Sequence, residues 1–378
     1  AEKPIIDKNA TNAVRIVGTE DLEIMPFRGV QNVFALQAGV VEDEGALHVR
    51  GSREDEIGYY VEGANVRNVV TGTTAVGLID EAVEEIQLQA GGFNAEYGGA
   101  NAGVILQELR TGGAKWDVGF LSESDGFTSK YKQKLGTYSS GYSNQVLTLS
   151  GPLLGSNKIR TFLATQRRVR DSDPVFWEGF DFKNLVDTGN RGGRVHWKDR
   201  DGDGTPEPDT LADLRLEPGN IAHTGRTAFD FNGTLLFDYN PIQLRVTGLY
   251  TAENREFNPA PIRNMLNLER QPEADRTSGL LNVKGTHILS PSLFYELNFS
   301  LYKQDRDIFD PVFDDNFIVY DDSAAAAKAD PSFTRFSSQG SVPQPYDLAG
   351  FPFHRPGTPV SFIDGDSRFS LYGKENDR

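Results

Sequence analysis

Two stretches of the chain decide its fold: YYVEGA at Tyr59–Ala64 and IQLQAGGFNAEYGGANAG at Ile86–Gly103. The first ends in a turn at Glu62-Gly63, and the second joins a short apolar strand to a glycine-rich loop. Glycine permits positive φ angles and close approach of backbones. No Gly-Lys-Ser/Thr step for a phosphate loop follows these glycines, and the chain has no Gly-x-Ser-x-Gly nucleophile motif. The two stretches therefore indicate a compact β-rich unit without catalytic residues.

Around these stretches, residues 1–114 are predicted to form one small α+β domain. Thr19 is expected to cap a first helix that ends before Pro26, and Asp80 to cap a third helix over 81–85. A second helix is expected to end at Gly39. The expected strands are 13–18, 46–50, 58–61, 86–90 and 104–109.

After Lys115 the pattern changes to long runs in which apolar and polar residues alternate. In the last run, Leu293, Tyr295, Leu297 and Phe299 share one face and the polar residues between them share the other. Runs of about ten residues are long enough to cross a bilayer as tilted strands. The predicted strands are 116–126, 142–153, 158–170, 226–240, 242–256, 277–289 and 293–307.

The connections between these strands favour a membrane barrel over a soluble β-sandwich, which would also alternate. Short turns that contain proline lie at 151–157, 240–241 and 290–292, and long segments lie between them. Outer-membrane barrels alternate tight periplasmic turns with long outer loops in this way. Seven strands cannot enclose a folded domain, which takes a barrel of roughly 22 strands. We therefore predict an α+β plug inside a transmembrane antiparallel β-barrel of the 22-stranded class. Residues 115–378 would be its N-terminal portion, and the chain would be part of a longer protein.

Composition excludes several other classes of protein. No run of 18 apolar residues exists, so a transmembrane helix is not expected. The formal charge of −16 disfavours nucleic acid, whose phosphates require clustered basic residues. The chain has no cysteine, and its five histidines are scattered. We therefore expect neither an enzyme nor a nucleic-acid-binding protein.

Four segments, in this order, resemble the plug domain of TonB-dependent outer-membrane receptors: Leu47–Gly51, Tyr59–Ala64, Glu84–Tyr97 and Gly103–Leu106. The family's Asp-Gly turn is replaced here by Glu62-Gly63. The GFNAEYG form is similar to the branch that often carries a carboxypeptidase-regulatory-like domain, to which the starch-utilisation C-type transporters are related.

This resemblance implies a protein of the bacterial outer membrane, surrounded by its lipids, that takes up a scarce nutrient. Uptake would be energised by the TonB complex through a segment N-terminal to the plug, of which Ala1–Pro4 would be the tail at most. Two alternatives stay open. One is a receptor-like barrel that acts as a structural scaffold for a surface lipoprotein or a larger outer-membrane complex, without transport. The other is a secreted calcium-dependent β-adhesin.

The resemblance also places candidate binding residues at the plug apex, the loops that face the ligand in this family. Asn65, Arg67, Asn68 and Thr71 could exchange hydrogen bonds with a polar ligand, unless this segment is an ordinary solvated turn. Arg50 resembles the family's plug arginine that pairs with acids on the barrel wall, here Glu253 or Glu296. The alternative for Arg50 is an ordinary surface residue.

A separate motif in the second long loop predicts a calcium site. Carboxylates at alternate positions followed by a turn glycine can wrap one Ca²⁺ ion with oxygen ligands. The bidentate glutamate of a helical calcium hand is missing, because Thr210 stands there. A bare acidic turn is the alternative. The candidate ligands are Asp199, Asp201, Asp203, Thr205, Glu207 and Asp209.

Overall fold

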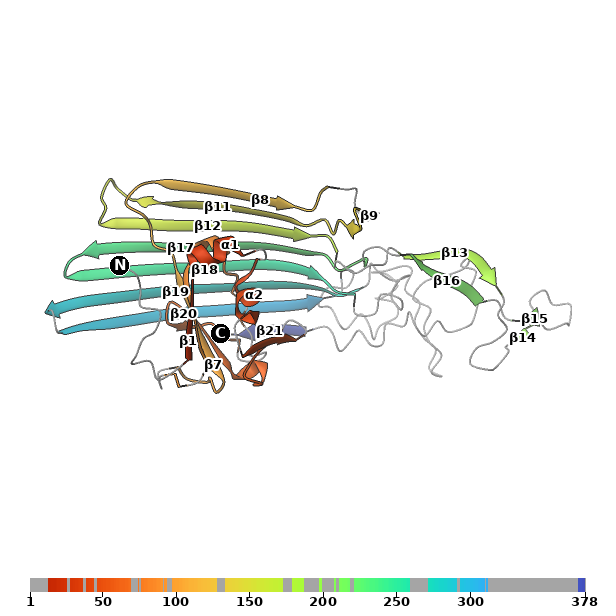
Figure 1. The fold of residues 1–378 in the computed structure, drawn as a ribbon, viewed down its shortest axis with the longest axis horizontal. Helices are drawn as coiled ribbons and strands as arrows, with labels where there is room; N and C mark the ends of the chain where they lie inside the picture. Colours follow the sequence, from red (N-terminus) through yellow and green to blue (C-terminus); the bar gives the residue numbers. More distant parts are fainter. Residues whose placement is uncertain are drawn as a thin grey trace, which may run out of the picture.

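The computed structural model describes two connected bodies, a small α+β unit and a long sheet (Figure 1). The described residues are 13–25, 28–36, 39–43, 46–68, 74, 76–90, 92–93, 97–127, 133–172, 179–186, 197–198, 207–208, 211–217, 221–258, 271–290, 293–309, 311 and 373–377.

The small unit, called the plug below, is built on a five-stranded sheet. Its strands lie in the order β1 (Ala13–Gly18), β6 (Val83–Ala90), β7 (Gly103–Leu109), β4 (Ile57–Val61) and β5 (Ala64–Asn65). Strands β4 and β7 are parallel, and the other pairs are antiparallel. A hairpin of β2 (Val40–Asp43) and β3 (Ala46–Val49) and two short helices, α1 (Thr19–Ile24) and α2 (Val30–Ala35), complete the unit.

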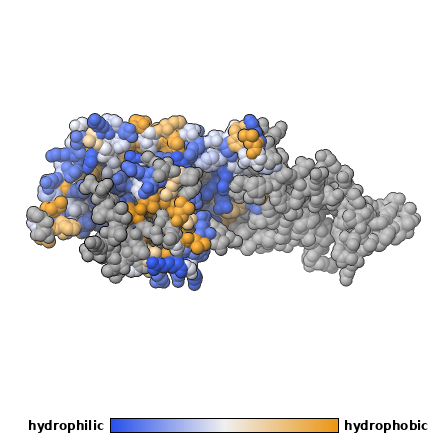
Figure 2. Space-filling model, in the orientation of Figure 1, coloured by the Kyte–Doolittle hydropathy of each residue, from blue (hydrophilic) through white to orange (hydrophobic). Residues whose placement is uncertain are grey.

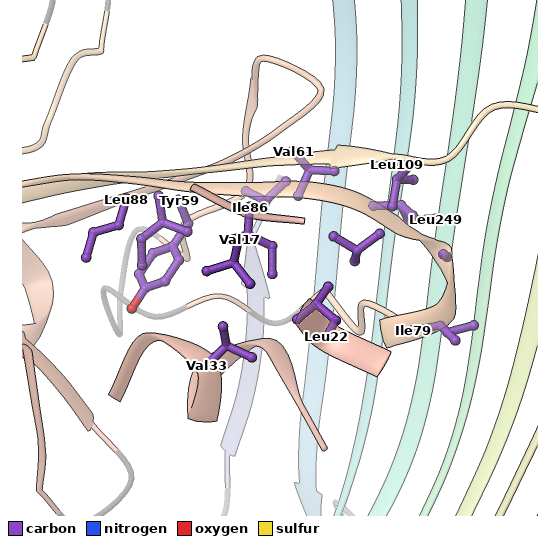
Figure 3. Close-up of a cluster of buried hydrophobic side chains, with 14 of the residues drawn as sticks. Val17, Leu22, Val33, Tyr59, Val61, Ile79, Ile86, Leu88, Leu109 and Leu249 are labelled. Atoms are coloured by element: carbon purple, nitrogen blue, oxygen red, sulfur yellow. The ribbon is translucent and has the colours of Figure 1, made fainter. Parts of the chain in front are cut away.

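Apolar side chains from the strands and helices form one core in the plug (Figure 3). Val17 and Ile86 come from paired strands, and Leu22 and Val33 come from the two helices that cover them. Leu249, from the long sheet, lies at the edge of the same cluster. The core therefore extends to the surface on which the plug is seated.

Two expected helix starts in the plug differ from the structure. Thr19 does not cap α1, because its hydroxyl donates to the carbonyls of Val83 and Glu84, each at 3.0 Å. The predicted third helix is only a 3-10 turn, η2 (Asp80–Ala82). Strand β6 begins at Val83 because pairing with β1, which reaches Glu85 opposite Gly18, requires an extended chain.

The long sheet, called the wall below, has eight antiparallel strands. All seven strands predicted between 116 and 307 are present, and a short eighth strand joins the edge. The fold class is confirmed, although the sheet is open at its two edges. The strands are β8 (Asp117–Ser124), β11 (Ser143–Pro152), β12 (Ile159–Arg170), β17 (Arg226–Tyr239), β18 (Ile242–Glu256), β19 (Glu273–Ser290), β20 (Leu293–Phe309) and β21 (Gly373–Asp377).

Small hairpins occupy parts of the long segments that the sequence did not predict to be strands. They lie at or beyond one end of the wall strands, on the right of Figure 1. The hairpin strands are β9 (Gln133–Lys134) with β10 (Thr137–Tyr138), β13 (Gly179–Val186) with β16 (Leu211–Glu217), and β14 (Trp197–Lys198) with β15 (Glu207–Pro208).

Many buried side chains of the wall are polar, and many of its exposed side chains are large and apolar. Asp230 and Asn232 are fully buried on the face toward the plug, while Phe299 is 66% exposed on the opposite face. Figure 2 shows the side that carries the plug, where hydrophilic and hydrophobic residues lie side by side. A protein in water has the reverse arrangement, since exposed apolar surface is unfavourable there. Large apolar residues exposed on the wall include Val118, Phe120, Leu147, Leu297, Phe299 and Leu301.

No helix among the described residues is long and apolar enough to span a membrane.

Candidate functional site at the plug–wall interface

The wall holds the plug through side chains that bind plug backbone groups. Asn232 accepts a hydrogen bond from the N–H of Ile79 at 2.8 Å and donates to the carbonyl of Gly77 at 3.0 Å. The hydroxyl of Thr251 accepts from the N–H of Gly77 at 2.8 Å. Buried backbone groups need such partners, because leaving them unpaired is costly. The inward polar positions of β17 and β18 therefore complete the hydrogen bonding of the segment from Gly77 to Ile79.

The same pattern continues where the plug leads into the first wall strand. The hydroxyl of Thr234 donates to the carbonyl of Arg110 at 2.6 Å. The N–H of Gly113 donates to the hydroxyl of Ser150 at 3.0 Å. The connection between plug and wall is thus fixed at several points along its length.

The turn at Glu62-Gly63 carries a buried ion pair between the plug and the wall. Glu62 lies 2.7 Å from the guanidinium of Arg245 on β18 and also accepts from the N–H of Leu109 at 2.7 Å. Asn298 on β20 donates to the carbonyl of Glu62 at 3.2 Å. Burial raises the pKa of Glu62, while Arg245 and the N–H of Leu109 act in the opposite direction. These two partners therefore favour the charged form of Glu62 and oppose the effect of burial.

The expected ion pair of Arg50 with Glu253 or Glu296 is not formed. Arg50 is exposed, in a turn with φ of 55°, where its N–H donates to the carbonyl of Gly39. Its expected partners are paired with wall bases instead, Glu253 with Arg226 and Arg276 and Glu296 with Lys284. A plug base that does reach a wall acid is Arg28, whose Nε lies 3.0 Å from Glu123 on β8.

The described residues of the predicted plug apex differ in exposure and in hydrogen-bond partners. Asn65 is exposed and accepts from the N–H of Arg67. The guanidinium of Arg67 donates to the carbonyls of Asp55 and Gly99 within the plug. Asn68 is 1% exposed and donates to Gln304 on β20 at 3.1 Å.

Thr71, the fourth residue of the predicted apex set, lies outside the described residues. The described apex residues thus make contacts within the plug and with the wall, and ligand binding by them stays a prediction.

A cavity of about 340 Å³ lies between the plug and the wall, next to the segment from Thr74 to Gly77. Four arginines line it: Arg28 from the plug, and Arg168, Arg226 and Arg276 from β12, β17 and β19. The sequence analysis did not single out these four. A usable signal was present, since the three wall arginines share the inward register of Gln166, Asp230 and Ser278. The other lining residues are Gly29, Asn32, Tyr59, Thr74, Val76, Gly77, Leu78, Gln107 and Thr251.

Several predicted sites cannot be placed. Asp199, Asp201, Asp203, Thr205 and Asp209 lie outside the described residues, and only the backbone of Glu207, in β15, is described. Within the described residues, no group of three or more His, Cys, Asp or Glu side chains could hold a metal ion.

The N-terminal segment Ala1–Pro4, the possible tail of the TonB-coupling region, also lies outside the described residues.

A folded unit seated by hydrogen bonds on the polar face of membrane-length strands defines the class of protein, a plugged outer-membrane β-barrel. No protein-family model matches the chain. A curated relative, the "TonB-dependent transporter Oar" of Myxococcus xanthus, is 29% identical in an alignment of 142 residues that covers 34% of this chain and 13% of the relative. The resemblance to TonB-dependent outer-membrane receptors is therefore confirmed, as is the outer-membrane location, and the relatives are transporters and receptors rather than enzymes.

Solved structures of similar fold include outer-membrane proteins of two bacteria. The outer membrane transporter YddB of Escherichia coli has a TM-score of 0.48 at 13% identity, covering 79% of this chain and 39% of that one. The ferric-catecholate import receptor Fiu of E. coli has a TM-score of 0.49 at 10% identity, covering 79% and 40%. The siderophore receptor PirA of Pseudomonas aeruginosa has a TM-score of 0.39 at 14% identity, covering 79% and 51%. The chain thus spans about half or less of the length of each of these proteins.

Proposed function

We propose that this protein takes up a scarce nutrient across the outer membrane, energised through the TonB complex. The observation that carries the proposal is the set of hydrogen bonds from the wall to plug backbone groups at Gly77, Ile79 and Arg110. Water can replace such partners at small cost, whereas an apolar interface would expose apolar surface when it opens. Hydrogen bonding of this kind therefore allows the plug to be displaced from the wall and to return to it.

The order of the plug strands supports a route for the applied force. Strand β1 is the edge strand of the plug sheet and, within the described residues, pairs only with β6. A pull on the chain before Ala13 acts first on this pairing and then on the segments that β6 supports. Strand β6 follows directly on η2 and thus on Ile79, which is bound to Asn232. Force on the N-terminal segment is in this way transmitted toward the hydrogen bond between Ile79 and Asn232, which holds the plug against the wall.

A depletion experiment tests the proposal while the nutrient is still unidentified. Cells that make the intact protein, with or without a functional TonB complex, are grown in defined medium, and the loss of each medium component is followed by mass spectrometry. We expect at least one limiting component to be lost faster only when protein and TonB are both present.

The matched control is a variant that lacks residues 13–110, the plug. Through its open passage the same component should enter whether or not TonB works. If no component depends on both the protein and TonB, the uptake function is contradicted.

Two further predictions, the scaffold alternative and the calcium loop, need experiments of their own. The scaffold alternative, and with it a surface lipoprotein partner, predicts a lipoprotein that co-purifies with the protein from cells in which no TonB-dependent depletion occurs. The calcium loop predicts that Ca²⁺, but not Mg²⁺, slows proteolytic cleavage between Asp199 and Asp209. Equal cleavage in the two ions would contradict it.

A further inference from the structure

We propose that the arginine-lined cavity between the plug and the wall binds a small oxyanion ligand with at least two carboxylate or phosphate groups. This inference rests on the proposed uptake function, because it names the chemical class of ligand that the cavity accepts on the way through the wall. The cavity lies toward the wall end at which the long segments gather. Arg168 and Arg276, for example, stand near the ends of β12 and β19 that adjoin the long segments after 170 and before 273.

Four arginines from four separate parts of the chain line this cavity. Arg28 comes from the plug, and Arg168, Arg226 and Arg276 come from three strands of the wall. Their side chains are between 28% and 38% exposed, so a ligand that enters the cavity can reach them. Guanidinium groups bind carboxylates and phosphates through two parallel hydrogen bonds, which is the strongest geometry available to a side chain for such groups.

Each of these arginines is paired with an acid that does not line the cavity. Arg28 pairs with Glu81 and, through its Nε at 3.0 Å, with Glu123. Asp230, which lies 2.7 Å from Arg168, is fully buried, and Glu253, which binds Arg226 and Arg276, is 8% exposed at its side chain. The lining residues of the cavity therefore include four basic side chains and no acidic one.

Two of the arginines share one acid. A single oxygen of Glu253 accepts from Nε and Nη2 of Arg226 and from Nη2 of Arg276. This group of two guanidinium cations and one carboxylate therefore carries one positive charge in excess, which favours an anionic ligand beside it.

The size of the cavity limits the ligand. A volume of about 340 Å³ lies at the lower end of the range for small-molecule sites. A compact polycarboxylate or a diphosphate fits this volume, whereas an oligosaccharide or a folded peptide does not. Citrate and pyrophosphate are therefore suitable probes of the two ligand chemistries, and glucose is a neutral control of similar size.

The test measures binding to the intact protein in lipid nanodiscs at low ionic strength by isothermal titration calorimetry. We expect citrate, pyrophosphate or both to bind and glucose not to bind. Arg168→Gln and Arg276→Gln should each weaken binding at least tenfold. The matched control is Arg160→Gln, on the same strand as Arg168 but near its other end, 3.9 Å from Asp238 and outside the cavity. It should bind as the unaltered protein does.

A second measurement uses the unaltered protein, so it does not depend on whether a variant folds. Phenylglyoxal modifies accessible arginines, and mass spectrometry reports the rate at each site. The bound anion should protect Arg168 and Arg276 but leave Arg160 unchanged. Binding of citrate alone identifies a carboxylate ligand, and binding of pyrophosphate alone identifies a phosphate ligand.

Binding of neither anion, or binding unchanged in both Gln variants, overturns the inference. If TonB-dependent uptake is observed and neither anion binds, only this inference fails. If an anion binds and no TonB-dependent uptake is observed, the proposed function fails and the site stands.

Discussion

Gly77 is the residue at which the plug backbone and the wall approach most closely around Asp230. A Cβ added there would lie 1.8 Å from Oδ1 of Asp230 and 2.7 Å from the hydroxyl of Thr251. Asp230 cannot move aside freely, because it is fully buried and is bound by Arg168 and Thr251. A single methyl group at this position therefore forces the plug segment away from its partners on the wall.

Gly77→Ala should weaken the seating of the plug by about 2–3 kcal/mol, through overpacking and the loss of hydrogen bonds to Asn232 and Thr251. The measurement is hydrogen exchange at the amide of Ile79, which donates to Asn232 and should lose most of its protection. Gly98→Ala is the matched control, because a Cβ there meets no atom within 4 Å. Equal protection of Ile79 in both variants would show that the contact does not seat the plug.

Removal of Arg245 should leave Glu62 as a buried carboxylate without its charged partner. Arg245→Gln is expected to destabilise the plug by on the order of 3 kcal/mol at neutral pH. The other charged groups that act on Glu62 are Glu108, which raises its pKa, and Lys284, which lowers it. Arg53→Gln, which breaks an exposed pair with Asp55, should change stability little.

The pH dependence of this variant has a definite sign. Burial already raises the pKa of Glu62 above its ordinary value of 4.5, and the loss of Arg245 raises it further. A raised pKa in the folded state gives stability that is present below 4.5 and is lost as pH rises through the folded value. The deficit in stability of the Arg245→Gln variant relative to the unaltered protein is measured by hydrogen exchange at Leu109. This deficit should therefore be small near pH 4.5 and grow toward neutral pH. Adding Glu62→Gln should remove most of the deficit and its pH dependence; a deficit independent of pH would contradict the account.

Residue types alone predicted little of this interface. The Glu62-Gly63 turn could be found from its sequence, but the partner of Glu62 could not, because Arg245 is 183 positions away. Arg50 was chosen by resemblance, and the structure pairs its expected partners with bases of the wall itself. The arginines of the cavity are spread over four elements, so only the register of the finished sheet brings them together.

Among the elements, the wall strands could be predicted because their signal is local. Alternation along each run sets which face meets lipid, and the structure agrees on β17, where Phe229 is exposed and Asp230 and Asn232 are buried. Pairing between distant segments leaves no such signal. Strand β21 is short and joins β20 from more than 60 positions away in sequence, so it was not predicted. The third plug helix was overpredicted because pairing of β6 with β1 overrides the local helix preference at Glu84 and Glu85.

The lipid-facing register of β20 predicts a cost that depends on depth. Phe299→Arg, near the middle of the strand, should destabilise the folded protein by about 2–4 kcal/mol, because it places a charge in the hydrocarbon region. Leu293→Arg, on the same face at the first residue of the strand, should cost only about 0–1 kcal/mol. Urea titration of the protein folded into liposomes measures both values. Equal costs at the two positions would contradict a membrane-spanning β20.

On the scale of the whole molecule, the polar face of the wall is stable because the plug packs against it. Fully buried Asp230 and Asn232 would be unfavourable in a soluble core, and they are tolerated here because plug backbone groups and neighbouring side chains bind their polar atoms. The exposed apolar face is equally unfavourable in water and requires lipid. The sequence could predict both faces, but not where the plug would be seated between strands that are far apart in the chain.

The most direct test of this account is the accessibility of spin labels along β20. The chain has no cysteine, so single cysteines can be introduced at each position from 297 to 301 and labelled without interference. Frequent collisions of a label with oxygen indicate that its position faces lipid. Frequent collisions with a water-soluble nickel chelate indicate that it faces water. In liposomes we predict oxygen maxima at Leu297, Phe299 and Leu301, with low oxygen accessibility at Asn298 and Ser300. Uniform access to the nickel chelate, or low access to both reagents at Phe299, would contradict a wall that stands in lipid around the plug.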